Sequence, residues 1–222
     1  MTDTGLRQRK KQHTRRALFE EALRLFAERG YDQTTTADIA AAAGVSPRTF
    51  FSYYPTKEDV VFYDSDARAA AALGTFTQRA PGEGPVDIMV RAVRAAVEVT
   101  GMPGGPSASE ALERARLVNA IPALQAHALR LGHQAQRRLS AALLDVCPGE
   151  LDPLDAGVAA AILMAAVQST SMFVMESTQP SEALGPAVDR ALALAWEGLA
   201  SLHARKRPPP HRPQTSRDPS AS

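Results

Sequence analysis

The chain has 222 residues, of which 45% are hydrophobic and 22% are charged, values close to those of soluble globular proteins. This composition excludes a chain that is disordered throughout, and the single cysteine, Cys147, excludes an internal disulfide and indicates a reducing, cytoplasmic compartment. The net charge of +1 conceals a segregation, because residues 1–57 carry +4, residues 58–203 carry −7 and residues 204–222 carry +4. Such a basic head on an acidic body is typical of a protein that meets a polyanion at one end, although terminal basic runs that are merely solvated give the same pattern.

The first predicted element is an amphipathic helix over residues 13–29. Leu18, Ala22, Leu25 and Phe26 fall on one stripe, and Gly30 follows as a suitable C-terminal residue. Residues 1–12 precede this helix, and we expect them to form a basic, flexible arm. Aromatic residues are scarce at 5% and alanine is abundant, so we expect an all-α protein of about nine helices.

Two short helices are predicted next. Thr35 and Asp38 have the spacing of a capping box and start a helix over residues 36–43, which Gly44 ends. Ser46 is a good N-cap and Pro47 suits the first helical position, so a second short helix runs to about residue 53. Two helices joined by a tight turn that contains glycine, behind an amphipathic helix, predict a helix-turn-helix unit.

The second short helix has two chemically different sides. Phe50 and Tyr54 are spaced i, i+4 and can close an apolar side onto the preceding helices. The opposite side carries Arg48, which suits guanine in a major groove, with hydroxyl-bearing residues beside it. Phe51 either contacts a thymine methyl group or packs in the hydrophobic core.

The remainder of the chain reads as long helices separated by Pro/Gly-rich turns. Thr56 with Asp59 predicts the start of a long helix that runs toward residue 76, and further helices are expected near residues 85–99, 107–118, 121–146, 153–176 and 182–204. Residues 156–175 are uncharged and about long enough to cross a bilayer, but they are rich in alanine and contain polar residues, so we expect a buried helix and no membrane partner. Residues 205–222 are Pro-rich and basic, and we expect disorder there.

The segment LFAERGYDQTTTADIAAAAGVSPRTFFSYYPTKEDVV carries a family resemblance. Residues 13–61 resemble the DNA-binding domain of the TetR family of bacterial transcriptional regulators, although Ser52 and Tyr54 depart from the commonest family pattern. The resemblance implies a helix-turn-helix domain over residues 13–56 and a ligand-binding and dimerisation domain over residues 57–204. It implies that residues 47–53 read bases and position phosphates, and that helix starts bind phosphate through free N–H groups. The predicted contacts to a double-stranded DNA operator are Thr34, Thr35, Thr36, Ser46, Pro47, Arg48, Thr49, Phe51, Ser52, Tyr53 and Lys57.

The resemblance also implies roles for the body. In the family, the last two helices pair with those of a second copy, so we expect a homodimer through residues 155–176 and 182–203. Residues 115–145 resemble a subgroup thought to accept acyl-CoA-like ligands, which implies a small hydrophobic effector and, for CoA phosphates, a nearby Arg114, Arg116 or Arg130. Candidate pocket residues, each of which also suits a core position, are Phe62, Phe76, Met89, Val93, Met102, Leu117, Met164, Gln168 and Met172.

No catalytic, metal or cofactor signature is present in the sequence. His127 and His133 are six residues apart, which does not put them on one helical face, and we expect both to be solvated or partly buried. We therefore predict a dimeric repressor that a small ligand releases from a palindromic operator. The alternatives are a helical-bundle ligand carrier or enzyme without specific DNA binding, and a nonspecific DNA-coating protein.

Overall fold

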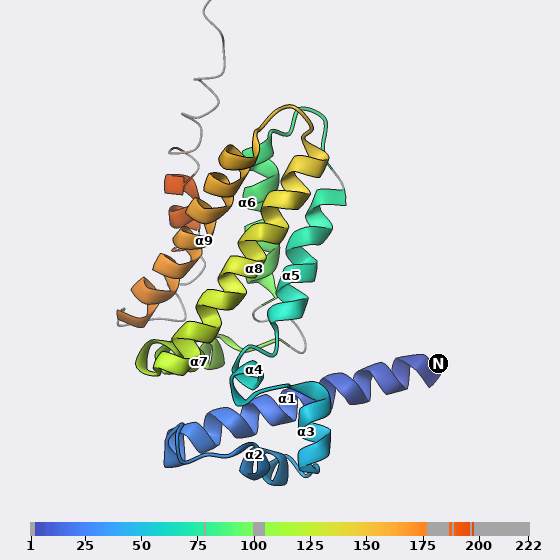
Figure 1. Ribbon diagram of the computed structural model, residues 1–222, viewed down its shortest axis with the longest axis vertical. Coiled ribbons are helices and arrows are strands. Elements are labelled where there is room, and N and C mark those ends of the chain that lie inside the picture. The colour runs from blue at the N-terminus through green and yellow to red at the C-terminus, as the bar shows by residue number, and fades with distance from the viewer. Residues whose placement is uncertain are drawn as a thin grey trace, which may run out of the picture.

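The computed structural model describes residues 3–77, 79–99, 105–176, 187, 189–195 and 197. The described chain is all-α, as predicted, and contains no strand. Figure 1 shows a small domain at one end, formed by the first four helices, below a bundle formed by the others. The helices are α1 (Asp3–Arg29), α2 (Thr36–Ala42), α3 (Pro47–Tyr53), α4 (Lys57–Val61), α5 (Ser65–Gly74), the 3-10 turn η1 (Thr75–Thr77), α6 (Pro85–Glu98), α7 (Ala108–Ala120), α8 (Pro122–Val146) and α9 (Pro153–Glu176).

The small domain, here called the head, is built on the predicted stripe of α1. Leu18, Ala22, Leu25 and Phe26 are all buried, and α2 and α4 pack against the same helix. Gly30 ends α1 with a φ of +82°, a left-handed conformation that glycine adopts without steric cost. Short helices of this kind gain most of their stability from such packing.

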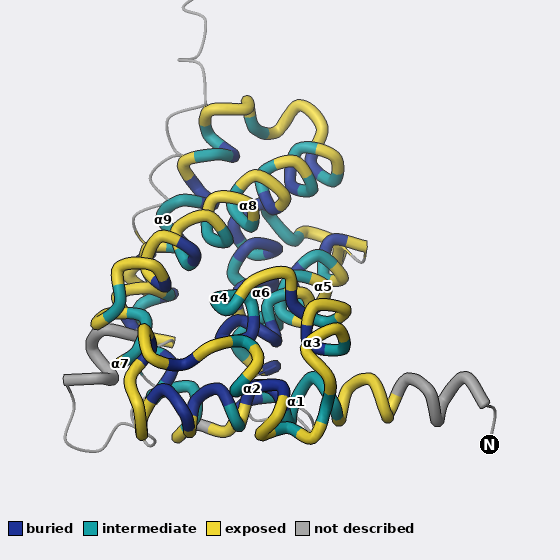
Figure 2. The backbone as a smooth tube through the Cα atoms, turned by 60° about the horizontal axis from the view of Figure 1, so that its bottom comes forward, coloured by how far each residue is buried: buried dark blue, intermediate teal, exposed yellow. Residues whose placement is uncertain are grey.

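The larger part, here called the body, holds a second core. α5 packs on α6, and α8 runs along α9. Buried residues lie on the inner faces of these helices, and exposed residues lie on their outer faces (Figure 2). Cys147 is buried in this core.

Two boundaries differ from the sequence-based prediction. α1 begins at Asp3 and not at residue 13, so the segment predicted as a flexible arm is helical from Asp3 onward. Arg, Lys and Gln are good helix formers, and no proline interrupts them. The long helix expected from residue 57 to residue 76 is instead divided into α4, α5 and η1. Phe62 and Tyr63 are buried in the core of the head, and the backbone turns between α4 and α5 to place them there.

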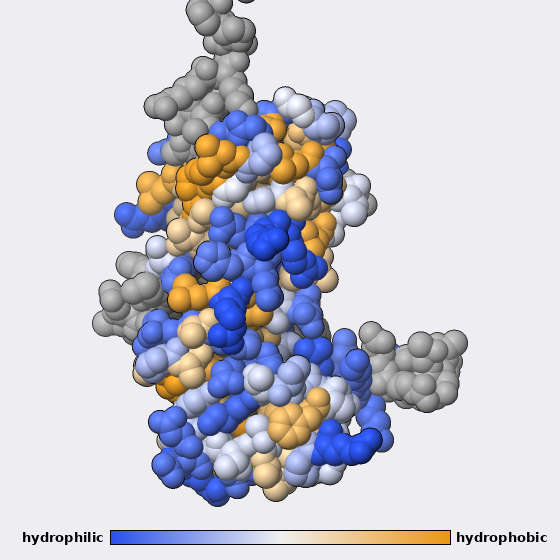
Figure 3. Space-filling view, viewed as in Figure 1, coloured by the Kyte–Doolittle hydropathy of each residue, from blue (hydrophilic) through white to orange (hydrophobic). Residues whose placement is uncertain are grey.

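α9 is the most apolar long helix. Its window Pro153–Thr170 has a mean hydropathy of 1.3, enough by length and composition alone to cross a membrane. α9 lies along α8 and buries Ala156, Ala160 and Leu163 completely, while only 28% of the window is buried within the chain. Hydrophobic residues gather at the end of the body farthest from the head, where α8 ends and α9 begins (Figure 3). The helix predicted over residues 182–204 falls largely outside the described residues.

Candidate DNA-binding site

α2 and α3 form the predicted helix-turn-helix. Thr35 caps α2: its hydroxyl accepts a hydrogen bond from the backbone N–H of Asp38 at 3.1 Å, and the Asp38 carboxylate accepts from the Thr35 N–H at 2.9 Å. Gly44 makes the turn with a φ of +67°. Ser46 then caps α3 by accepting from the N–H of Thr49 at 3.1 Å. Local signals thus fix both helix starts.

α3 is held against the head by one side only. Phe50 and Tyr54 are buried, and the Tyr54 hydroxyl donates to the carbonyl oxygen of Arg15 at 3.0 Å. Burial is the main reason that the pKa of Tyr54 rises to about 12, so this phenol stays a neutral donor. Because α1 and α3 are joined at this hydrogen bond, α3 is a rigid element of the head.

The other side of α3 faces solvent. Arg48 is exposed and makes no ion pair or hydrogen bond with any described side chain, and Phe51 is 53% exposed with its ring edge-on to Phe50 at 5.5 Å. Ser46, Pro47 and Ser52 are also exposed, but the Ser52 hydroxyl donates to the Thr49 carbonyl at 2.6 Å. Thr49 and Tyr53 are half-buried, and Tyr53 packs against the core of the head. An unpaired guanidinium and an exposed aromatic ring on one rigid face can hydrogen-bond a base edge and contact a thymine methyl group.

The three threonines at the start of α2 differ in accessibility. Thr35 is exposed and Thr36 is half-buried. Thr34 is only 1% exposed, and its hydroxyl donates to the Gly30 carbonyl at 2.9 Å. The Thr34 side chain is therefore occupied inside the head and does not face outward.

Lys57 is also engaged within the head. Its ammonium group donates to the carbonyl oxygens of Tyr31 at 2.8 Å and Thr34 at 3.1 Å, and it lies 3.8 Å from the centre of the Tyr31 ring. The Tyr31 hydroxyl donates to the Glu58 carboxylate at 2.5 Å, and burial, followed by this carboxylate, raises the pKa of Tyr31. Lys57 and Glu58 thus hold the turn between α1 and α2 at the start of α4. The sequence gives no sign of this, because the acceptors are backbone carbonyls more than twenty residues away.

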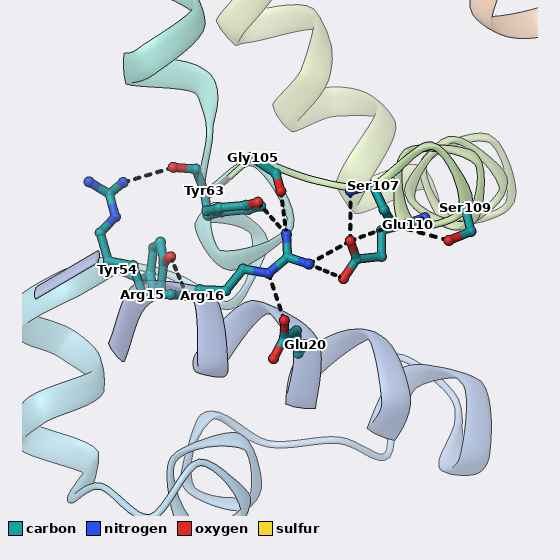
Figure 4. A network of polar contacts seen from close by, with 9 residues as sticks. All are labelled: Arg15, Arg16, Glu20, Tyr54, Tyr63, Gly105, Ser107, Ser109 and Glu110. Carbon is teal, nitrogen blue, oxygen red and sulfur yellow. Dashed lines mark hydrogen bonds and ion pairs between the residues drawn. The ribbon is translucent and has the colours of Figure 1, made fainter. Parts of the chain in front are cut away.

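Arginine side chains connect the head to the body (Figure 4). The Arg16 guanidinium of α1 donates to both carboxylate oxygens of Glu110 on α7, at 2.5 and 2.6 Å, and to the Tyr63 hydroxyl at 2.7 Å. Burial opposes ionisation of Glu110, but hydrogen bonds from Arg16 and from Ser107 hold the pKa of its carboxyl below the ordinary value. The result is a bidentate, charge-assisted pair between the two parts of the chain.

A second connection joins α4 to α8. His127 is buried, its Nε2 lies 3.1 Å from the Asp59 carboxylate, and its ring stacks on Phe62 at 5.2 Å between centroids. Arg130 lies 2.9 Å from Nδ1 of the same ring. The expectation that His127 is solvated or only partly buried is therefore wrong, because its carboxylate partner comes from a distant helix. His133 is exposed.

The predicted pocket residues divide between the two cores. Phe76, Met89 and Val93 are buried together in the body, with Met164 packed against them. Phe62 is buried in the core of the head, and Leu117 packs against it. Gln168 is exposed, and the side chains of Met102 and Met172 lie outside the described residues. The described side chains of this set therefore belong to two separate cores and do not surround one common space.

These features define a helix-turn-helix domain, and comparison with known proteins shows which family this domain resembles. Residues 18–63 match the family model "Bacterial regulatory proteins, tetR family". Over these residues, the chain is similar to the DNA-binding domain of TetR-family regulators.

The similarity to individual proteins extends beyond the head. The chain is 40% identical over 144 residues to the HTH-type transcriptional regulator TcmR of Streptomyces glaucescens, and the alignment spans 61% of each protein. It is 52% identical over 44 residues to the HTH-type transcriptional regulator LuxR of Vibrio harveyi, which covers 20% of this chain and 22% of LuxR. A TetR family transcription regulator from Marinobacter aquaeolei VT8 shares the fold, with a TM-score of 0.50 and 24% identity over 86% of this chain and 97% of that one.

Proposed function

We propose that this protein is a cytoplasmic transcriptional regulator that binds a two-fold operator as a homodimer and is released from it by a small hydrophobic effector. The observation that carries the proposal is the outer face of α3, which presents an unpaired Arg48 and an exposed Phe51 in a domain that matches the TetR-family model. A side chain that served only the stability of the head would be packed or paired.

In this proposal, DNA binding belongs to residues 13–56, which lie within the head, and effector binding and dimerisation belong to residues 57–204. Arg48 reads a base edge, Phe51 contacts a thymine methyl group, and the capped starts of α2 and α3 meet phosphates through their N–H groups. Residues 1–12 and 205–222 supply additional positive charge at the two ends. The effector has the acyl-CoA-like character that the resemblance of residues 115–145 implies.

The dimer surface includes the outer face of α9. Leu154 is 74% exposed, and Val158 and Ala165 are also exposed. Together with Ala161 and Gln168 they follow one another at intervals of four and three residues, the spacing of a helix seam that packs against another helix. Ala159 and Ala160, in contrast, are buried in the core of the same chain and are not available to a partner. A dimer that pairs two copies of α9 would place two α3 helices on successive half-sites.

The test is selection of bound sequences from a randomised DNA library, followed by gel shifts with the selected site and with the DNA that flanks the gene. The expected result is a palindromic site that binds at least a thousand times more tightly than random DNA. Enrichment of no sequence would overturn the proposal and would favour a ligand carrier. Tight binding to all sequences alike would favour a nonspecific DNA-coating protein.

A further inference from the structure

Three charged side chains meet at the start of α5. Asp64 immediately precedes α5, Arg68 lies one turn into that helix, and Arg114 lies on α7. Arg114 donates to one Asp64 oxygen at 2.7 Å, and Nε of Arg68 lies 3.6 Å from the other. Burial opposes ionisation of Asp64, but the two arginines hold the pKa of its carboxyl below the ordinary value. The group therefore carries one negative and two positive charges.

The cationic donors in this group exceed the acceptors. Arg68 makes no hydrogen bond through its guanidinium with any described residue, since 3.6 Å is beyond hydrogen-bond reach. Arg114, which is buried, has the single Asp64 acceptor within the described part of the chain. The second Asp64 oxygen is buried without a hydrogen-bond partner. A buried excess of positive charge is costly unless an anion compensates it.

Arg68 is only partly buried and remains accessible. Burial lowers the pKa of its guanidinium from the ordinary value, although 34% of the side chain is open to solvent. The charged group is thus accessible to a ligand.

Apolar side chains flank the charged group on both sides. One turn after Arg68 on α5, Ala72 and Leu73 belong to the core of the body or pack against it. One turn after Arg114 on α7, Leu117 and Val118 pack against the core of the head. Leu73, Leu117 and Val118 are only partly buried. A charged group with incompletely buried apolar positions one turn away on each helix matches an amphipathic molecule.

We propose that Arg68 and Arg114 bind an oxyanion, a carboxylate or a phosphate, that forms one end of a hydrophobic effector. This inference rests on the effector site of the proposed function and adds the charge of the ligand. Arginine forks match both oxyanions, and the missing negative charge neutralises the excess cation.

Hydrogen bonds connect the proposed oxyanion site to the head. The Asp64–Arg114 hydrogen bond joins α7 to the corner between α4 and α5, next to Tyr63, which accepts hydrogen bonds from Arg15 and Arg16 of α1. An oxyanion that takes donors from Arg114 competes with Asp64 for them. The anion therefore favours a state in which the corner between α4 and α5 is held less tightly. A ligand that binds this state more tightly than the other shifts the position of the head.

The experiment measures ligand binding to the full chain without DNA, by calorimetry and thermal unfolding. The probes are decanoate, decyl phosphate and decanol, which share one apolar chain and differ in the end group. We expect both anions to bind and to raise the melting temperature, with decanol at least tenfold weaker; the stronger anion distinguishes carboxylate from phosphate as the natural end group.

Variants of Arg68 test whether this side chain binds the anion. Arg68→Met should weaken both anions at least tenfold and leave decanol unchanged, and the free variant should melt no lower than the native chain because it loses an uncompensated cation. Arg68→Lys should retain part of the anion affinity. Arg138→Met is the matched control, because Arg138 is an exposed arginine on α8 without an ion pair among the described residues.

Equal binding of anions and decanol, unchanged anion binding by Arg68→Met, or no binding of any probe would each overturn the inference. Gel shifts of the free protein test the proposed function separately. Anion binding without operator binding would support the oxyanion site and contradict the proposed regulatory function. Operator binding without anion binding would support the regulatory function and contradict the oxyanion site.

Discussion

Replacing Lys57 with methionine distinguishes a structural role of this lysine within the head from a direct contact with DNA phosphate. The substitution keeps most of the aliphatic stem but removes two charge-assisted hydrogen bonds, to the carbonyls of Tyr31 and Thr34, and the contact with the Tyr31 ring. A hydrogen bond to a charged group contributes about 1.5–3 kcal/mol, and an exposed cation–π contact about 0.5–1 kcal/mol. Lys57 is half-buried, so water can replace part of what is lost. The lower ends of these ranges amount to about 3.5 kcal/mol for the two hydrogen bonds and the ring contact together. Because water replaces part of these contacts, we expect a loss of about 2 kcal/mol in the free energy of unfolding.

The assay compares thermal and denaturant unfolding of Lys57→Met with that of Lys11→Met, in which an exposed lysine of α1 changes in the same way. A loss of 2 kcal/mol in a chain of this size lowers the melting temperature by about 4–8 °C, and the control should stay within about 1 °C. The salt dependence of operator binding supplies the second readout. A direct phosphate contact would lower its slope by about 0.9, whereas an internal clamp leaves the slope unchanged in folded protein. Unchanged stability with a reduced slope would refute the structural role.

Other substitutions test the remaining interfaces. Arg48→Ala should relax base preference at one operator position by about 1–3 kcal/mol without loss of stability; an unaltered preference in a randomised-site selection would exclude a base contact. Ala165→Glu together with Val158→Glu should give monomers by light scattering, because unpaired charge in a desolvated interface costs several kcal/mol; a folded dimer would exclude this face of α9. The lowered pKa of Glu110 stabilises the native state above pH about 4.5, and this contribution disappears as the pH falls further. Glu110→Gln should therefore lower stability at pH 7 and flatten its decline in acid, and an identical pH profile would refute the pair with Arg16.

Local sequence signals predicted the helix-turn-helix well. The Thr35–Asp38 box and the Ser46–Pro47 pair are complete within four residues, so both short helices start where the sequence indicated. The division of the long helix after residue 61 was missed, since it depends on where Phe62 finds its packing partners and not on a local breaker.

The contacts between head and body were beyond the reach of sequence reasoning. Arg16 and Glu110 are 94 residues apart, and neither residue type is unusual in its own helix. Likewise, His127 acquires its carboxylate partner only when α8 folds against α4. For the pocket, apolar and methionine residues spaced along helices suit a core as well as a cavity, so the residue pattern alone does not distinguish the two.

The early start of α1 changes how its basic residues can meet DNA. Arg9, Lys10 and Lys11 are consecutive on a helix, so their side chains leave the axis about 100° apart and share no common direction. Figure 1 shows this part of α1 projecting beyond α3. A flexible strand can turn every cation toward one groove, whereas a helical rod presents one or two of these three at a time. The N-terminal segment should thus release fewer counterions than its charge suggests, and its contribution should depend on the rotation of α1 about its own axis.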